Sequence, residues 1–440
     1  MITSLLIRPV RHHAVRIPPT EVIALRNRVQ QVALQTRYHG SSHGDTRVLF
    51  VGTFPPRECG IATFTDDVRD AYDACQGFPS DVIAVSDEGM EYQYASCVIG
   101  EINRNVRSTY VEAARIANAH DCDIVNVQHE YGLYGGHYGA MLVEFVAGLR
   151  KPVVITLHTV LPNPGDQLLN ITRELCHRSE TVIVLAEIGR QILQDVYGVD
   201  ICKVKVVLHG APDVPAHTSA SGKRALGLET NTVLTTFGLL SRGKGIEYVL
   251  NALPTIFDRH PDAVYMLLGE THPEVRRVEG ESYRESLREQ AQSLGIGDRV
   301  RFENRYLADD EVVSYLMATD VYVSPSLDRS QIVSGTLSYA VACGRAAVAT
   351  EYLYARELLA EGRGITVPLR DSHSLAGAIN HVLDDPKLRH SIEANAYRFG
   401  RRMTWPRIAA DYEEAFVASR LQSPHIASVA GSGFSYTLTL

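Results

Sequence analysis

A glycine-rich turn with two basic side chains lies in the second half of the sequence, within Phe237–Leu253 (FGLLSRGKGIEYVLNAL). An apolar run comes first, followed by Arg242, Gly243 and Lys244 and then by residues spaced as in an amphipathic helix. Backbone N–H groups at a helix N-terminus, with a lysine beside them, bind phosphate well. The segment therefore predicts a phosphate site, although a tight turn of an ordinary α/β sheet would look the same.

A second turn of this kind lies further along the chain, at Ser334-Gly335-Thr336, where another helix is predicted to start. Two phosphate-binding turns in one α/β half predict a diphosphate ligand, and therefore a nucleotide donor. Arg242 and Lys244 can neutralise the charge that develops on a leaving diphosphate, which is the charge that a transferase has to stabilise. Glu270, at the end of an intervening strand, is a further candidate for donor binding.

Polar residues also follow three predicted strands of the first half. One strand leads into Gly60 and Ile61, whose N–H groups begin a helix and can point at a ligand. Another ends in Gln128–Gly136 (QHEYGLYGG), in which His129 is the candidate for contact with the reacting sugar. The next ends at His158, which can donate to a phosphate or to a sugar hydroxyl. Open α/β sheets bind ligands at the carboxyl ends of their strands, so we expect a site at these loops; a plain turn or a structural histidine is the alternative.

The rest of the sequence alternates between strands and helices, which predicts an α/β fold with two parallel sheets covered on both faces. Strands are expected at 47–53, 81–85, 123–128, 152–157, 181–185 and 204–208, and again at 232–238, 263–269, 299–303, 320–323, 346–349 and 365–367. Helices are expected at 61–75, 106–120, 137–149, 166–178, 187–197, 245–258, 281–294, 309–317, 334–343, 353–361 and 372–384.

The domain boundaries follow from composition. Residues 1–45 are a basic extension, 46–212 a first Rossmann-like domain and 222–400 a second, with a Pro-, Ser- and Ala-rich linker at 212–222. A helix is expected at 404–421 and a loose tail at 422–440. Three interpretations of the extension remain open: a segment packed on the first domain, a basic helix on a membrane surface, or, less well supported, a targeting segment.

Composition excludes several classes of protein. A net charge of -8 argues against a nucleic-acid binder, and no apolar run reaches the roughly 20 residues that a membrane helix needs. The seven cysteines are scattered and form no CxxC pair, which is typical of a reduced, cytosolic protein. Metal-binding HxxxH or HExxH spacing on a predicted helix is absent, and the Asp121–Asp123 pair precedes a strand instead of following one. No metal site is therefore expected.

Six segments together carry a family resemblance: PPRECGIATF, VNVQHE, VITLHT, FGLLSRGKG, VYVSPS and AVACGRAAVAT. With them, residues 47 to 420 resemble retaining glycosyltransferases of the GT-B fold, in the large sequence family 4 (group 1) that includes bacterial mannosyl- and glucosyltransferases. The resemblance implies two Rossmann-like domains facing across a cleft, the first for the acceptor and the second for a nucleotide-sugar. It also implies that the Trp405 helix crosses back to the first domain.

The resemblance assigns roles to particular residues. It implies that Lys244 holds the donor diphosphate, that His129 lies beside the reacting centre with His158 in the next loop, and that Gly60 faces the diphosphate.

The sequence departs from the family pattern in two motifs. Leu239 stands where an arginine is usual, and Arg242 is positioned to replace it from within the turn. The family's E-x7-E motif aligns with Gln331 and Tyr339, neither of which is acidic. The chain must therefore hold the sugar and the ribose differently, or it has lost turnover.

The resemblance implies a retaining, metal-independent hexosyltransferase that moves a sugar from a nucleotide-sugar to a hydroxyl of a carbohydrate, lipid or small-molecule acceptor. A pseudo-glycosyltransferase that binds a nucleotide or a partner without turnover, and a GT-B sugar phosphorylase, remain the alternatives. No cofactor is expected besides the nucleotide-sugar substrate. We expect a cytoplasmic protein, and a peripheral contact with the membrane stays open. The sequence does not specify the sugar, the base, the acceptor or the oligomeric state.

Overall fold

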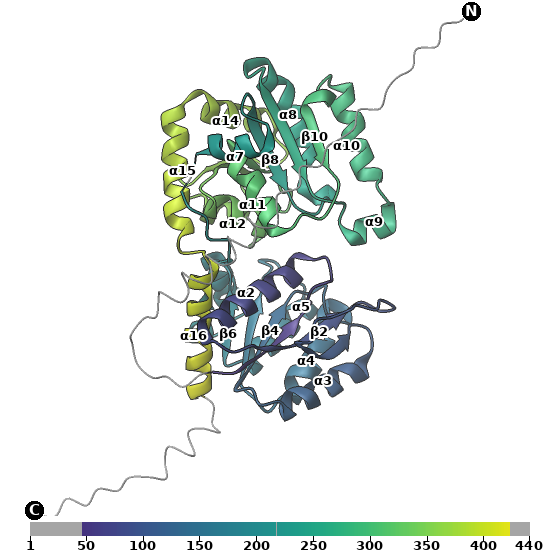
Figure 1. The fold of residues 1–440 in the computed structure, drawn as a ribbon. Helices are drawn as coiled ribbons and strands as arrows, with labels where there is room; N and C mark the ends of the chain where they lie inside the picture. Colours follow the sequence, from purple (N-terminus) through teal and green to yellow (C-terminus); the bar gives the residue numbers. More distant parts are fainter. Residues whose placement is uncertain (1–45, 217, 423–440) are drawn as a thin grey trace, which may run out of the picture. The chain divides into compact units, whose positions relative to one another are not determined.

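The computed structural model describes residues 46–216 and 218–422, and it holds two parallel β-sheets with helices packed against them (Figure 1). Both sheets belong to one compact unit. The predicted α/β fold of two Rossmann-like halves is confirmed. The predictions for residues 1–45 and for 423–440 of the tail lie outside the described residues.

The first sheet has seven strands in the order β3-β2-β1-β4-β5-β6-β7. Its strands are β1 (Val48–Gly52), β2 (Asp81–Ser86), β3 (Val98–Asn103), β4 (Ile124–His129), β5 (Val153–Leu157), β6 (Thr181–Val184) and β7 (Val204–Val206). Its helices are α2 (Gly60–Gln76), α3 (Arg107–Ala119), α4 (Met141–Gly148), α5 (Asp166–Arg178) and α6 (Glu187–Asp195). The strand order reverses between β1 and β4, and the loops after these two strands are where such a sheet binds ligands.

The second sheet has six strands in the order β10-β9-β8-β11-β12-β13. Its strands are β8 (Thr232–Phe237), β9 (Ala263–Leu268), β10 (Val300–Glu303), β11 (Val321–Ser324), β12 (Ala346–Thr350) and β13 (Ile365–Val367). Its helices are α7 (Ser219–Leu226), α8 (Ile246–Arg259), α9 (Pro273–Glu279), α10 (Ser282–Ser293), α11 (Asp309–Ala318), α12 (Gly335–Ala342), α13 (Leu353–Leu358), α14 (Ser372–Asp384) and α15 (Pro386–Gly400). Order reverses between β8 and β11, so the loops after these strands form the second ligand-binding edge.

The central strands are buried on both faces, which explains why they are continuous apolar runs instead of alternating patterns. Every residue of β1 and of β9 is buried. The edge strand β3 differs: its first four residues alternate between partly buried and exposed, only Ile102 is fully buried, and its sequence VIGEIN contains a glycine and a glutamate. This strand was not predicted from the sequence, because an edge strand needs no continuous apolar run.

The predicted linker at 212–222 is partly wrong, because α7 begins inside it at Ser219. Two of its side chains bind Asp320, a buried carboxylate at the start of β11: the Ser219 hydroxyl at 2.6 Å and the Lys223 amine at 2.5 Å. The serine- and alanine-rich composition predicted a loop. In the structure the segment is helical, and its contacts with Asp320, about a hundred residues away, hold it in place. Helices α9 and α15 were also not predicted.

The last helix, α16 (Trp405–Gln422), packs on the first sheet instead of the second. The Tyr412 hydroxyl lies 2.9 Å from Thr156 of β5, and the Ser419 hydroxyl 2.7 Å from Thr181 of β6. Phe416 contacts Phe50 of β1 edge to face at 6.3 Å. Within 46–216 and 218–422, none of the helices has the length and apolarity to span a bilayer.

Candidate functional site

The predicted phosphate turn forms a short 3-10 helix, η3 (Arg242–Lys244), directly before α8. Gly245 joins the two with a φ of 67°, and a Cβ there would lie 2.3 Å from the carbonyl oxygen of Pro325, so only glycine fits. The turn holds Lys244 partly buried, and desolvation lowers the pKa of its amine. Among the described residues the Lys244 side chain has no hydrogen-bond or ion-pair partner. It is therefore free to pair with an anion.

Lys244 lines a small cavity, about 20 Å³ in volume, together with residues that precede and begin α12. The other lining residues are Thr236, Phe237, Tyr322, Ser324, Pro325, Ser326, Gln331, Ser334 and Thr336. Ser334 caps α12, and its hydroxyl accepts a hydrogen bond from the N–H of Leu337 at 3.3 Å. The N–H groups of the first helical turn, starting at Gly335, have no carbonyl partner within the helix and present a positive dipole end.

Gln331 occupies the position of the first glutamate of the family motif and lines the same cavity. Its Oε1 accepts from the Ser326 hydroxyl at 2.7 Å, and its Nε2 donates to the carbonyl of Val333 at 2.8 Å. The structure thus brings Lys244, Gln331 and the start of α12 to one place, as the two predicted phosphate turns require.

Arg242 does not line this cavity. Its guanidinium pairs with Glu279 of α9 at 3.0 Å and lies over the ring of Tyr283 of α10 at 5.2 Å. The turn directs the Arg242 and Lys244 side chains to different sides, and Arg242 is 60% exposed. Gly243 is exposed and also outside the lining, and its carbonyl accepts from the N–H of Leu327 at 2.9 Å.

Glu270 lies after β9 as expected, but also outside the cavity. One of its carboxylate oxygens accepts from Arg276 at 3.1 Å, and the other is buried without a partner among the described residues. Glu58, in the loop before α2, lies close to it: burial and the Glu270 carboxylate raise the pKa of Glu58.

Three buried histidines follow strands of the first sheet: His129 ends β4, His158 follows β5 and His209 follows β7. The rings of His158 and His209 both meet the ring of Phe64 edge to face, at 4.8 and 5.0 Å. Burial lowers the pKa to about 4 for His129 and His209 and to about 3 for His158. All three are therefore neutral at pH 7.

The His129 ring is fully buried beside Tyr131, at 5.0 Å edge to face, and Tyr134, at 6.2 Å stacked. Neither ring nitrogen has a partner among the described residues, which is rare for a buried polar group. By contrast, His158 Nε2 lies 2.9 Å from Oε1 of Gln128. His129 keeps unused hydrogen-bonding capacity, and because it has no exposed surface, the residues around it must move before a ligand can reach it.

His209 is the histidine that the sequence analysis missed. Its Nδ1 lies 2.7 Å from the carbonyl of Gly210, so this nitrogen carries the proton and Nε2 is an acceptor. A Cβ on Gly335 would lie 2.9 Å from that Nε2, which places the ring against the start of α12. The sequence did contain a sign of it, because His209 directly follows the predicted strand 204–208, just as His158 directly follows the predicted strand 152–157.

Helix α2 starts at Gly60, one residue before the predicted start. Cys59 caps it: the thiol sulfur accepts from the N–H of Ala62 at 3.3 Å and lies 3.2 Å from the Thr53 hydroxyl. Gly60 is exposed with nothing within 4 Å of an added Cβ, and Ile61 packs partly against the first core. Neither residue lines the Lys244 cavity.

Tyr339, at the position of the second glutamate of the motif, is almost fully buried. Its hydroxyl lies 3.4 Å from carboxylate oxygens of Asp67 on α2 and of Asp309 on α11. Burial first, and Asp309 next, raise the pKa of Asp67 to about 8, and burial raises that of Asp309. The pair is therefore partly protonated at neutral pH. Sequence spacing gave no sign of this cluster, whose members come from three distant helices.

A larger cavity of about 340 Å³ lies elsewhere, lined by residues from α6, β7, α13, α15 and α16, including Glu187, Glu357, Arg363, Arg402 and Phe399. It contains none of the predicted site residues. Among the described residues no group of three or more His, Cys, Asp or Glu side chains is placed to hold a metal ion. Metal independence itself stays a prediction.

Two family models match the chain in succession. Residues 59–213 match the model for Glycosyltransferase Family 4, and residues 221–399 match Glycosyl transferases group 1. The two matched ranges correspond to the two sheets and contain His129 and Lys244.

The chain belongs to the group 1 glycosyltransferases of the GT-B fold.

This glycosyltransferase is 25% identical over 314 residues to the D-inositol 3-phosphate glycosyltransferase of Corynebacterium glutamicum (strain R), covering 66% of this chain and 71% of the relative. It is 24% identical over 405 residues to the alpha-monoglucosyldiacylglycerol synthase of Streptococcus pneumoniae, covering 85% and 87%. Among solved structures, Anabaena HepE in complex with UDP and glucose shares the fold with a TM-score of 0.66 at 20% identity, covering 84% of this chain and 98% of that one. The sucrose-phosphate synthase of Thermosynechococcus elongatus does so with a TM-score of 0.68 at 18% identity, covering 87% and 100%.

Proposed function

We propose that this glycosyltransferase moves a hexosyl group from a nucleoside diphosphate sugar to an acceptor hydroxyl, with retention of anomeric configuration and without a metal ion. The observation that carries the proposal is Lys244. Its amine is partly desolvated, has no partner among the described residues, and shares a cavity with the residues that begin α12. A positive charge and a helix N-terminus at one cavity complement a diphosphate.

In the proposed reaction the bond between the anomeric carbon and the diphosphate oxygen breaks, and the acceptor oxygen bonds to that carbon on the same face. The acceptor proton passes to the departing diphosphate oxygen. Lys244 and the N–H groups at Gly335 and Thr336 stabilise the negative charge that develops there. Both ring nitrogens of the neutral His129 lack a partner among the described residues, and we assign this ring to hydrogen bonding with the sugar.

The names of similar proteins support a nucleotide-sugar donor. HepE structures hold UDP, UDP-glucose, or UDP with glucose. Curated relatives act by name on D-inositol 3-phosphate, on phosphatidyl-myo-inositol and in the synthesis of a glucosyldiacylglycerol. We extend this only to the class of reaction, a hexosyl transfer to a sugar-like or lipid-linked hydroxyl. We further propose that it takes place in the cytoplasm, with peripheral contact to the membrane where the acceptor is a lipid.

Binding without turnover is a second candidate function, and Tyr339 is the observation that favours it. The residue fills the position of a ribose-binding glutamate, and its hydroxyl faces Asp67 and Asp309. Gln331 fills the position of the motif's first glutamate, and its side-chain amide is already hydrogen-bonded to Ser326 and Val333. A protein that had lost the motif would still bind a nucleotide at Lys244.

One experiment separates the two candidates. Thermal unfolding is measured with UDP, GDP and ADP and with their sugars, because a ligand that binds only the folded protein raises the melting temperature. The best donor is then incubated with candidate acceptors, and the product anomer is assigned by NMR. Product with the donor's anomeric configuration supports the proposal. Stabilisation without product across donors and acceptors supports binding alone, and no stabilisation by any nucleotide overturns both.

The metal-free mechanism has its own test. Activity is expected to be unchanged in EDTA, because Lys244 and a helix start supply the positive charge at the diphosphate. Loss of activity on chelation, with recovery in Mg²⁺ or Mn²⁺, would mean that the diphosphate site has been misassigned.

A further inference from the structure

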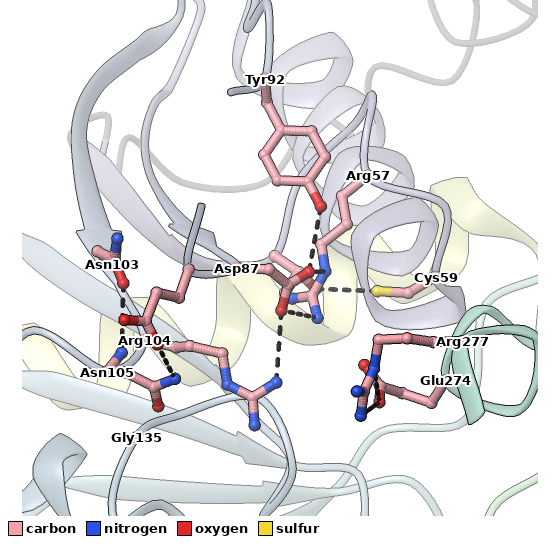
Figure 2. A network of polar contacts seen from close by, with 12 residues as sticks. Arg57, Cys59, Asp87, Tyr92, Asn103, Arg104, Asn105, Gly135, Glu274 and Arg277 are labelled. Atoms are coloured by element: carbon pink, nitrogen blue, oxygen red, sulfur yellow. Dashed lines mark hydrogen bonds and ion pairs between the residues drawn. The ribbon is translucent and has the colours of Figure 1, made fainter. Parts of the chain in front are cut away.

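A second group of basic residues lies in the first half of the structure, around Asp87, which follows β2 (Figure 2). Arg57, in the loop after β1, binds its carboxylate through Nε at 2.9 Å and Nη2 at 3.0 Å. Arg104, directly after β3, approaches it through Nη1 at 3.4 Å, and the Tyr92 hydroxyl donates to it at 3.1 Å. Figure 2 shows both guanidinium groups converging on this one carboxylate.

The charges in this group do not balance. Arginine stays protonated in proteins, so Arg57 and Arg104 carry two positive charges against the single negative charge of Asp87. Glu88, the next acidic residue, accepts instead from the amide of Asn105 at 2.8 Å. The arginine side chains are only 13% and 28% exposed, so water compensates the surplus charge poorly.

Each arginine also retains an unused donor. Nη1 of Arg57 and Nε of Arg104 are buried and have no acceptor among the described residues. Buried donors in folded proteins almost always have a partner, so two of them in one cluster need an explanation. An anionic oxygen would satisfy both the donors and the surplus charge.

The cluster is held beside the histidine loop. The carbonyl of Arg104 accepts from the Tyr110 hydroxyl at 2.8 Å, and the same hydroxyl accepts from the N–H of Gly135 at 2.7 Å. A Cβ at Gly135 would lie 1.6 Å from that carbonyl, so the loop from His129 to Gly136 packs directly on Arg104. The arginines therefore lie at the same carboxyl edge of the sheet as His129, on the half that does not contain Lys244.

We propose that Arg57 and Arg104 bind a phosphate group carried by the acceptor. That the ligand is the sugar acceptor rests on the proposed function, whereas the presence of an anion site does not. Arginine guanidinium groups bind phosphate oxygens with paired, charge-assisted hydrogen bonds, and Asp87 occupies only part of that donor capacity. The phosphate ester belongs either to a soluble sugar phosphate or to a lipid headgroup.

The first test measures the binding of inorganic phosphate by calorimetry at constant ionic strength. It uses Lys244→Ala as the background, so that the donor site does not contribute. Arg104→Gln and Arg57→Gln are each expected to weaken binding 10-fold or more. The matched control is Arg115→Gln, on α3, whose side chain is 71% exposed and pairs only with Glu112 on its own helix; it should bind phosphate as the background does.

Two further variants keep the test decisive if an Arg→Gln variant fails to fold, which circular dichroism would show. Arg104→Lys retains the charge but loses the guanidinium fork, and should bind phosphate with intermediate affinity. Asp87→Asn removes the competing carboxylate and should tighten binding. No phosphate binding in the Lys244→Ala background, or equal affinity in the arginine variants that fold, would overturn the proposal.

The source of the phosphate is decided by two arms: glucose 6-phosphate in solution, and sedimentation with phosphatidylcholine vesicles with or without phosphatidylinositol. Arginine-dependent binding in either arm supports the site and names the source. If arginine-dependent binding is found neither with glucose 6-phosphate nor with the vesicles, a phosphate-bearing acceptor is refuted. If nucleotide-sugars neither stabilise the protein nor turn over but phosphate binding still depends on Arg104, the proposed function fails and the anion site stands.

Discussion

The two halves of the molecule place opposite kinds of chemistry at equivalent positions of the same fold. Three buried, neutral histidines lie at the carboxyl edge of the first sheet. At the carboxyl edge of the second sheet, Lys244 lies beside a helix start and has no side-chain partner among the described residues. Desolvation acts on both sites and lowers the pKa of His129 and of Lys244 alike. The outcome differs because a free lysine titrates near 10.4 and a free histidine near 6.5. The same downward shift therefore makes the three rings neutral at pH 7, whereas an anionic ligand beside Lys244 would favour the protonated amine.

This contrast matches a division of labour in sugar transfer. The leaving diphosphate carries charge and needs a cation, whereas the sugar and the acceptor hydroxyl need neutral hydrogen-bonding partners. Arg57 and Arg104 add a cationic site to the first half, but further along the sheet edge, in the loops of β1 and β3.

The largest effect is expected from removing the charge in the second half. Lys244→Ala should lose about 2–4 kcal/mol of transition-state stabilisation, which is on the order of 100-fold or more in kcat/KM. Lys387→Ala, at an exposed position of α15, serves as the control and should retain full activity. If Lys244→Ala binds donor and turns over normally, the cation of the second half has no part in the reaction.

A smaller effect concerns the cluster around Tyr339, where α2 of the first half meets α11 and α12. The folded pKa of Asp67, about 8, is raised above its unfolded value of 3.8, so its stabilising contribution is complete below pH 3.8 and is lost as the pH rises through 8. Asp67→Asn imitates the protonated form and should raise the melting temperature at pH 8–9, by an amount that corresponds to about 1–2 kcal/mol.

The increase in melting temperature caused by Asp67→Asn should become smaller toward pH 4, where the wild-type carboxyl is already protonated. Asp121→Asn, at an exposed carboxylate, is the control. A gain that is the same at every pH would contradict the raised pKa.

A neutral histidine should matter less than the lysine. His129→Phe keeps the ring but removes both unpartnered nitrogens, so stability should hold or rise while kcat/KM falls about 10-fold, the value of one neutral hydrogen bond. The pH profile of the wild type should show no histidine titration between pH 6 and 7, since the pKa of His129 is about 4. An unchanged rate in the variant, or a break near pH 6.5 that the variant removes, would show that the ring has a different role.

The smallest effect is expected for the ribose. Tyr339 offers one hydroxyl where the family has a carboxylate, and a neutral group binds a diol more weakly. A nucleoside diphosphate and its 2′-deoxy analogue should therefore differ by about 1 kcal/mol in binding, roughly 5-fold. Competition against the donor measures this ratio. A 100-fold preference for ribose would indicate that another carboxylate binds the diol, with Asp67 and Asp309, both 3.4 Å from the Tyr339 hydroxyl, as the described choices.

Much of the fold could be read from local patterns. The central strands were predicted to within one or two residues, because a strand buried on both faces must be a continuous apolar run. The edge strand β3 and the helix α7 were not, because β3 is half exposed and α7 depends on Asp320, about a hundred residues away. The turns before helices at Lys244 and Ser334 were equally visible, since a glycine-containing turn before a helix is a local feature.

The sequence by itself determined the α/β class, the two turns that precede helices at Lys244 and Ser334, and the histidines that follow strands, all of which depend on neighbours in the chain. Only the tertiary structure decided which side chains share a site. It turned Arg242 toward Glu279 and away from Lys244, placed His209 against the start of α12, and surrounded Tyr339 with carboxylates from two other helices. It also set two arginines against one aspartate at the ends of three strands. The physical reason is that charge balance and desolvation depend on distances between residues far apart in sequence, which no local pattern encodes.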